Sequence, residues 1–240
     1  MDMEPHAAAC SKQLEQLKKD FEEFAYIVSH DMKAPVRAIV NLSQWIEEDL
    51  GDHLPPDVKH NMDLLRNRAF RLERMIEALL QYSRVSRYDL ETGPTDLLEL
   101  LLALKAELPP HVQVDVPAEL PVLLTYKAKL RQVLSQLLQN ASFFTQKDRP
   151  KIIVRVQEQA EFLLFEVTDN GDGIPAEALS KVFTLFYTVC PKDKVDTVGA
   201  GLAISKKTVQ FAGGTIEALA NEPEGTTIRF TWPKGPLTNT

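Results

Sequence analysis

The stretch FAYIVSHDMKAPVRAI, residues 24–39, sets a histidine and an aspartate side by side in a helix-like pattern, with a proline five residues after the histidine. Apolar residues step by three or four through and before this stretch: Leu14, Leu17, Phe21, Phe24, Val28, Met32, Val36 and Ile39. This spacing predicts a long amphipathic helix with a coiled-coil seam. Between Val28 and Val36 the steps are all four, so the seam should drift around the helix there.

A second helix is predicted after the breaker GDHLPP, residues 51–56. Its apolar residues again step by three and four: Met62, Leu65, Ala69, Leu72, Ile76 and Leu79. Two long helices joined by a Gly/Pro loop form an antiparallel hairpin. Because one hairpin has little to pack against, we expect two chains to pair into a four-helix bundle, which makes the protein a homodimer.

The sequence pattern changes near residues 87–96, where Gly93 and Pro94 end the helical periodicity. We therefore predict two domains, residues 1–92 and 93–240. In the second, helices are expected at 95–107, 127–144 and 200–212. Strands are expected at VQVDV, PVLLT, KIIVRVQEQ, EFLLFEVTDN, GTIEALA and GTTIRFTW. This order predicts an α/β domain with helices layered on one face of a mixed sheet, so the whole chain has an α plus α/β fold.

Composition excludes several classes of protein. The chain has 44% hydrophobic and 25% charged residues and a formal net charge of -7, which argues against a nucleic-acid partner or an anionic-membrane binder. Apolar runs such as LLELLLALKAEL contain charges well before the ~20 apolar residues that a bilayer span needs. The N-terminus also lacks the pattern of a secretory signal. We expect no membrane span in this chain and a cytoplasmic location.

His30 is the candidate nucleophile of the first helix. Two helical residues turn by about 200°, so His30 points away from Val28 and Met32 and should be exposed. Residues one turn further should add a basic, uncrowded flank that attracts an anion: Lys33, Ala34 and Arg37. An imidazole attacks through one nitrogen when the other is protonated and held, and Asp31 is the nearest carboxylate. On this segment alone, an ordinary surface histidine stays the alternative.

Two glycine-bearing segments are candidate nucleotide sites. VTDNGDGIP, residues 167–175, ends a strand with Asp169, Gly171 and Gly173. Small residues there would let a base approach the backbone while the Asp169 carboxylate accepts a hydrogen from an amino group such as that of adenine. An ordinary turn is the alternative. TVGAGLAISKKTV, residues 197–209, starts a helix with Gly199 and Gly201, where free N–H groups favour phosphate.

Two further segments support a nucleotide site only weakly. KVFTLFYTVCPKDKVD, residues 181–196, contains Phe183 and Phe186 and then a polar stretch, which suits a mobile lid or an ordinary surface loop. The predicted helix YKAKLRQVLSQLLQNASFFT places Gln136 and Asn140 four residues apart, hence on one face. Mg²⁺ takes oxygen ligands such as an Asn carbonyl while keeping several waters.

Taken in order, these segments resemble the sensor histidine kinases of two-component signalling over nearly the whole chain. SHDMKAP resembles the phospho-acceptor box, QLLQNASFFT the Asn box, DNGDGIP the first Gly box, VFTLF the Phe box and GAGLAI the second Gly box. FAYIVSHD is similar to the acceptor box of phytochrome-type kinases. The resemblance implies a dimeric phosphotransfer hairpin followed by an ATP-binding domain of the type that gyrase and chaperone ATPases share.

The resemblance also implies roles for individual residues. His30 would be phosphorylated from ATP and pass the group to an aspartate of a response regulator receiver domain, with Asp31 as the assisting base. Asn140 would hold Mg²⁺ and Asp169 would bind adenine. The same boxes supply the remaining expected nucleotide contacts: Gln136, Gly171, Gly173, Phe183, Phe186, Gly199, Gly201 and Leu202. An upstream sensor domain is a further expected partner.

The chain departs from the family pattern at several positions. Gln136 stands where an Asn is usual, Phe143 where a basic residue is usual and Thr197 where a glycine is usual, so phosphate and nucleotide contacts should be weaker. A pseudokinase acting as a docking or phosphorelay scaffold is therefore the alternative function, although the retained Asp169 argues against it. An amide at Gln136 cannot activate water as the Glu of hydrolysing relatives does, which disfavours a simple ATPase. Ala34 can hold no water, which predicts weak phosphatase activity.

Overall fold

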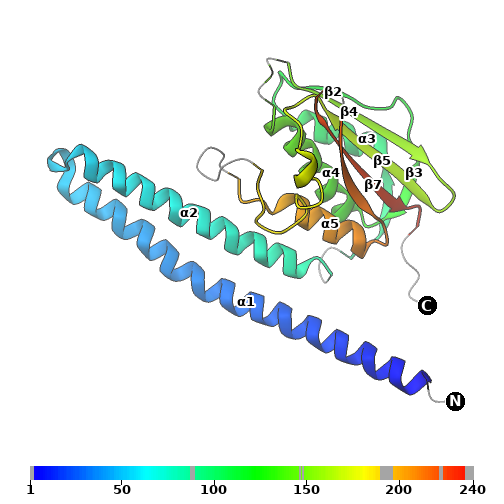
Figure 1. The fold of residues 1–240 in the computed structure, drawn as a ribbon, viewed down its shortest axis with the longest axis horizontal. Coiled ribbons are helices and arrows are strands. Elements are labelled where there is room, and N and C mark those ends of the chain that lie inside the picture. Colours follow the sequence, from blue (N-terminus) through cyan, green and yellow to red (C-terminus); the bar gives the residue numbers. More distant parts are fainter. Residues whose placement is uncertain are drawn as a thin grey trace. The chain divides into compact units, whose positions relative to one another are not determined.

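The computed structural model describes residues 3–86, 90–145, 147, 149–189, 197–221 and 224–235. The chain divides into two compact units, Met1–Arg84 and Val85–Thr240. Figure 1 shows a helical unit, blue to cyan, and a unit of mixed helices and strands, green to red. The predicted boundary at residue 92 stays a prediction.

The first unit is a pair of helices. Helix α1 (Met3–Leu50) is followed by the short 3-10 turn η1 (Gly51–His53) and by α2 (Pro56–Arg84), which returns alongside α1 (Figure 1). Gly51 turns the chain with a positive φ of 47°, a conformation that glycine adopts without steric cost. Pro35 lies inside α1, and the helix continues through it. The predicted antiparallel hairpin is confirmed.

Helix α1 has two apolar faces rather than one seam. Val36 is buried against Ala69 and Ile76 of α2, with Val40 beside them. Several other apolar residues of α1 are exposed in the single chain: Phe21, Phe24, Met32, Ile39, Leu42, Trp45 and Ile46. The residues of the predicted seam therefore fall on two faces of α1 and not on one. The reason is that an apolar pattern with steps of three and four drifts slowly around a helix that has 3.6 residues per turn. Within the described residues, no helix is both long and apolar enough to cross a bilayer.

The second unit is built on a five-stranded sheet with the strand order β2-β4-β5-β7-β6. The strands are β2 (Gln113–Asp115), β4 (Lys151–Glu158), β5 (Phe162–Asp169), β6 (Ile216–Ala220) and β7 (Thr226–Pro233). Strands β2 and β4 pair in parallel, and the other neighbours pair antiparallel. A separate antiparallel pair is formed by β1 (Gly93–Asp96) and β3 (Val122–Thr125).

Helices cover one face of this sheet. They are α3 (Leu97–Ala106), α4 (Lys127–Phe143) and α5 (Gly201–Phe211), and the short 3-10 turn η2 (Ala176–Ala178) precedes α5. On β5 the buried residues alternate along the strand: Leu163, Phe165 and Val167. These side chains share one core with the buried faces of α3 and α4. The predicted mixed sheet with helices on one face is confirmed (Figure 1).

Aromatic residues of the core anchor strand β5, which ends at the candidate site residue Asp169. The rings of Phe165 and Phe230 stack with centroids 4.7 Å apart. Trp232 is fully buried, and its Nε1 donates a hydrogen bond of 2.7 Å to Oγ1 of Thr125 in β3. Buried aromatic residues of this size dominate the packing of a small core. These contacts anchor the middle of β5, and its last residue, Asp169, pairs with Ile152 of β4.

Candidate active site

His30 and Asp31 form a pair on the surface of α1. Their side chains are 73% and 72% exposed, and His30 Nδ1 lies 3.0 Å from Asp31 Oδ1. A carboxylate only accepts hydrogen bonds, so Nδ1 must donate and must carry the ring proton. The neutral imidazole then keeps its lone pair on Nε2, the nitrogen that can attack an electrophile. The exposure that helix geometry predicts for His30 is observed.

The prediction that Lys33 and Arg37 give His30 a basic surface is wrong. Lys33 forms an ion pair with Glu77 of α2, and Arg37 Nε donates a hydrogen bond of 2.9 Å to Oε1 of Glu73. Both cations are therefore balanced by carboxylates of the partner helix. Lys33 and Arg37 therefore add little net positive charge beside His30.

Asp169 occupies the end of β5 in a fixed orientation. Its Oδ1 accepts hydrogen bonds from the backbone N–H groups of Gly171, at 2.8 Å, and Thr226, at 3.1 Å. Burial raises the pKa of Asp169; the two backbone donors oppose this shift, and the charge of Asp172 adds to it. The second oxygen, Oδ2, is the one with which this carboxylate can accept a hydrogen from an amino group.

The glycines after Asp169 permit close packing of the loop. A side chain at Gly171 would put its Cβ 2.5 Å from the carbonyl oxygen of Phe144 and 3.0 Å from Asp169 Oδ1. Gly173 has a φ of 77° and would place a Cβ 3.3 Å from the carbonyl oxygen of Gly225. Both predicted glycines therefore bring the loop against the end of α4 and the β6–β7 turn, next to Asp169.

Gly225 and Thr226 belong to this site without having been predicted. Gly225 has a φ of 98°, and a Cβ there would collide with the backbone oxygen of Asp169. This close approach brings the N–H of Thr226 to the Asp169 carboxylate. The available signal in the sequence was a glycine in the turn before the last strand. Such a glycine indicates a hairpin, but it does not indicate that the turn contacts Asp169, 56 residues earlier.

Gln136 and Asn140 of α4 form a linked pair of amides. Gln136 Nε2 donates a hydrogen bond of 2.9 Å to Asn140 Oδ1. A Cβ at Gly201 would collide with the carboxamide of Gln136, so the first turn of α5 packs directly on it. A carbonyl oxygen has two lone pairs, and Asn140 Oδ1 uses one for Gln136. Its second lone pair fits Mg²⁺, which usually binds one or two protein oxygens besides phosphates and water.

The predicted Phe and second Gly boxes are joined through the backbone. Phe186 has a positive φ of 66°, and its N–H donates a hydrogen bond of 2.8 Å to the carbonyl oxygen of Gly199. Phe183 and Leu202 are partly buried against the core. Helix α5 begins at Gly201 without a side-chain cap, which leaves N–H groups suited to an anion. The polar part of the suggested lid, residues 190–196, lies outside the described residues.

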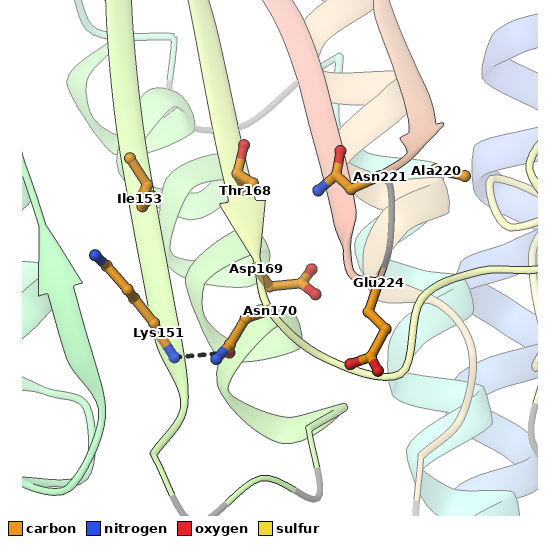
Figure 2. A pocket seen from close by; sticks show the side chains of 8 residues that line it. All are labelled: Lys151, Ile153, Thr168, Asp169, Asn170, Ala220, Asn221 and Glu224. Atoms are coloured by element: carbon orange, nitrogen blue, oxygen red, sulfur yellow. Dashed lines mark hydrogen bonds between the residues drawn. The ribbon is translucent and has the colours of Figure 1, made fainter.

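A pocket of about 460 Å³ lies beside Asp169 but is not the predicted nucleotide site. Figure 2 shows its lining at the ends of β4, β5 and β6, with Asn170 hydrogen-bonded to the backbone of Lys151. Ile153 and Thr168 point into it, and they alternate with residues buried beneath the helices. The pocket therefore opens on the face of the sheet that is turned away from α4 and α5. The other predicted nucleotide residues lie on the α4 and α5 side.

Two protein-family models match the chain, in the order that its two units follow. The His Kinase A (phospho-acceptor) domain matches residues 8–87. The Histidine kinase-, DNA gyrase B-, and HSP90-like ATPase matches residues 125–236. Together the two models cover most of the chain. The first contains His30 and Asp31, and the second contains Gln136, Asn140 and Asp169.

Curated relatives include sensor proteins of several kinds. The chain is 28% identical to the phytochrome-like protein Cph1 of Synechocystis sp., over 95% of this chain and 31% of the relative. It is 31% identical to cyanobacterial phytochrome B of Nostoc sp., over 91% and 30%, respectively. It is 29% identical to the aerobic respiration control sensor protein ArcB of Escherichia coli, over 91% and 29%. The chain thus spans about a third of the length of these relatives.

Solved structures show the same fold. Full-length ShkA in complex with AMPPNP aligns with a TM-score of 0.65 and 21% identity, over 90% of this chain and 46% of that one. The histidine kinase ThkA in complex with the response regulator protein TrrA aligns with a TM-score of 0.63 and 21% identity, over 94% and 66%. With a phospho-acceptor hairpin and an ATPase domain matched in this order, the chain belongs to the sensor histidine kinases of two-component signalling.

Proposed function

We propose that this chain is an ATP-dependent protein histidine kinase that phosphorylates His30 and then passes the phosphoryl group to an aspartate of a response regulator. The observation that carries the proposal is the hydrogen bond between His30 Nδ1 and Asp31 Oδ1. In the neutral imidazole this bond places the lone pair on Nε2 of an exposed helical histidine, in a chain that also contains the family's ATPase domain. A nucleophile in this state needs only a positioned phosphoryl donor.

The transfer follows from this arrangement. The lone pair of Nε2 forms a bond to the γ-phosphorus of ATP, while the bond from that phosphorus to the bridging oxygen breaks and ADP leaves with the electron pair. Positive charge develops on the imidazole, and the Asp31 carboxylate stabilises it through Nδ1 and can accept the Nδ1 proton. Phosphoryl transfer needs little covalent assistance, so positioning and charge neutralisation account for most of the catalysis.

The nucleotide would be held by the second unit. Asp169 accepts a hydrogen from the adenine amino group through Oδ2, and Gly171 and Gly173 keep the adjoining backbone accessible. Asn140, oriented by Gln136, would hold Mg²⁺, which supplies neutralisation of the phosphate charge when it is bound. The remaining contacts would come from the Phe box and the start of α5: Phe183, Phe186, Gly199, Gly201 and Leu202.

The partners are proposed from the same features. The exposed apolar face of α1 supports a homodimer whose hairpins pair into a four-helix bundle. The ThkA complex with a response regulator supports docking of a receiver domain. The relatives are about three times as long as this chain, which supports further domains, such as the expected upstream sensor domain, in the whole protein. The predicted cytoplasmic location stays part of the proposal.

Labelling of the purified chain tests the proposal. The chain is incubated with Mg²⁺ and γ-labelled ATP beside His30→Gln and Asp169→Asn, and acid-labile label on protein is counted. We expect label on the wild type and none on either variant, because one lacks the acceptor and the other the adenine contact. A folded dimeric wild type that gains no label would instead favour the pseudokinase scaffold.

A further inference from the structure

His30 has a second neighbour besides Asp31. The ring of Tyr26 lies one helical turn earlier, with ring centroids 6.3 Å apart and ring planes inclined by 29°. Residues four apart share a helix face, and helical side chains lean toward the N-terminus. The imidazole of His30 therefore leans back toward the phenol of Tyr26 as an offset stacked pair, so its ring has a neighbour besides Asp31.

Tyr26 is itself held by the other helix of the hairpin. The guanidinium carbon of Arg84, the last residue of α2, lies 5.3 Å from the centroid of the Tyr26 ring. A cation at this distance from an aromatic centroid is attracted by the ring. Tyr26 is 50% exposed, so without these contacts its side chain would have room to move. The contacts join His30, Tyr26 and Arg84 into one cluster that spans both helices.

We propose that Tyr26, held by Arg84, is a positioning residue for phosphoryl transfer at His30, an inference that rests on the proposed function. A single hydrogen bond to Asp31 fixes one edge of the imidazole but allows the ring to swing about that bond. The stack on Tyr26 restricts the plane of the ring. Together the two contacts keep Nδ1 on Asp31 and Nε2 directed outward, which raises the fraction of molecules in a reactive geometry.

The contact predicts which part of Tyr26 matters. Tyr26 and His30 meet through their rings, and Arg84 also faces the ring of Tyr26. Tyr26→Phe keeps the ring and should retain the effect, whereas Tyr26→Leu keeps an apolar side chain but removes the stack. Phe70→Leu is a matched control, because Phe70 is an aromatic residue of α2 that is 46% exposed.

The test uses the full chain and a donor that bypasses the nucleotide site. Phosphoramidate, a small phosphoryl donor, is reacted with each variant, and the rate constant for His30 phosphorylation is measured. Ring ¹⁵N shifts of His30 are recorded on the same samples to give its tautomer. We expect Tyr26→Leu to react about three- to tenfold more slowly, with a mixture of tautomers. Tyr26→Phe and Phe70→Leu should stay within about twofold of the wild type.

Two outcomes would overturn the inference. One is a Tyr26→Leu protein with the wild-type rate constant and the wild-type ¹⁵N shifts. The other is a Tyr26→Phe protein as slow as Tyr26→Leu, which would assign the effect to the hydroxyl group. Failure of the proposed function looks different: the wild type would accept phosphoryl groups from phosphoramidate but never from ATP. The ¹⁵N shifts test whether Tyr26 positions the His30 ring, whether or not the wild type is phosphorylated from ATP.

Discussion

Gln136 donates a hydrogen bond of 2.9 Å from Nε2 to Oδ1 of Asn140, one turn further along α4. The bond fixes the amide of Asn140 with its oxygen toward Gln136 and a second lone pair available for a cation. The usual family residue at position 136 is also an amide, so Gln136 keeps the donor that orients Asn140. The departure from the family pattern at this position therefore preserves the interaction on which the proposed Mg²⁺ contact depends.

Gln136→Glu should reverse that hydrogen bond. A carboxylate cannot donate, so Asn140 would turn its NH₂ toward the new side chain and its oxygen away from Mg²⁺. We expect protein labelling to fall by about three- to tenfold and ADP release per phosphohistidine to rise. Gln139→Glu is the control, because it is the same substitution at an exposed position of the same helix. Equal labelling by both variants would contradict this role of Gln136.

Substitutions of Gly199 and Gly201 by alanine should have different effects. Gly199 has a φ of 73° and no room beside the backbone oxygen of Tyr187, so Gly199→Ala should destabilise the fold by about 1–2 kcal/mol or more. The three atoms nearest to a Cβ at Gly201 all belong to the carboxamide of Gln136, the far end of a flexible side chain. Gly201→Ala should therefore displace that side chain and reduce labelling more than stability. Thermal unfolding and labelling are compared with Gly235→Ala, where a Cβ meets no atom within 4 Å. A Gly201→Ala protein that loses stability but labels normally would contradict the prediction.

Asp169 should make the stability of the chain fall as the pH rises. Its pKa is raised in the folded state above the ordinary value of 3.8, so the folded protein binds more protons than the unfolded chain between that value and the raised one. Stability is therefore lost as pH rises through this window. Relative to Asp169→Asn, the wild type should lose free energy of unfolding across the window and then level off.

Urea unfolding at a series of pH values measures this difference. Asp115→Asn, at an exposed carboxylate of the edge strand β2, controls for the loss of a surface charge. If the difference between wild type and Asp169→Asn does not change with pH, the environment of Asp169 is not the one described here. A wild type that gains free energy of unfolding relative to Asp169→Asn as the pH rises would contradict the sign.

Asp31→Asn should slow autophosphorylation without removing the acceptor. An amide can still accept a hydrogen bond from His30 Nδ1, but it carries no charge to stabilise the developing imidazolium and cannot accept a proton. We expect the initial rate of labelling to fall by about a hundredfold, in the range of general base catalysis. Asp49→Asn, at an exposed position of the same helix, should label normally. Wild-type rates in Asp31→Asn would show that the pair with His30 is not needed for transfer.

The hairpin could be predicted from sequence because a three-and-four apolar pattern depends only on residues within a few turns. Partners that lie far apart in the chain could not. Glu73 and Glu77 neutralise Arg37 and Lys33 from the other helix, and nothing in the local sequence of α1 indicates this. Gly201 was predicted for phosphate binding, yet its closest constraint is Gln136, on a different helix. Local patterns thus identified the elements and the boxes, whereas contacts between elements determine what each residue does.

The last prediction concerns the dimer and rests on the exposed apolar face of α1. Ile39, Leu42 and Ile46 are exposed and spaced by three and four residues, so they lie on one stripe. Ile39→Glu would bury an unpaired charge if this stripe packs against a second chain. We expect the dimer dissociation constant to rise by about a hundredfold, as measured by sedimentation. Asn41→Glu adds the same charge about 200° around the helix and should leave the dimer intact. If Ile39→Glu dimerises as tightly as Asn41→Glu, the bundle uses another face of the hairpin.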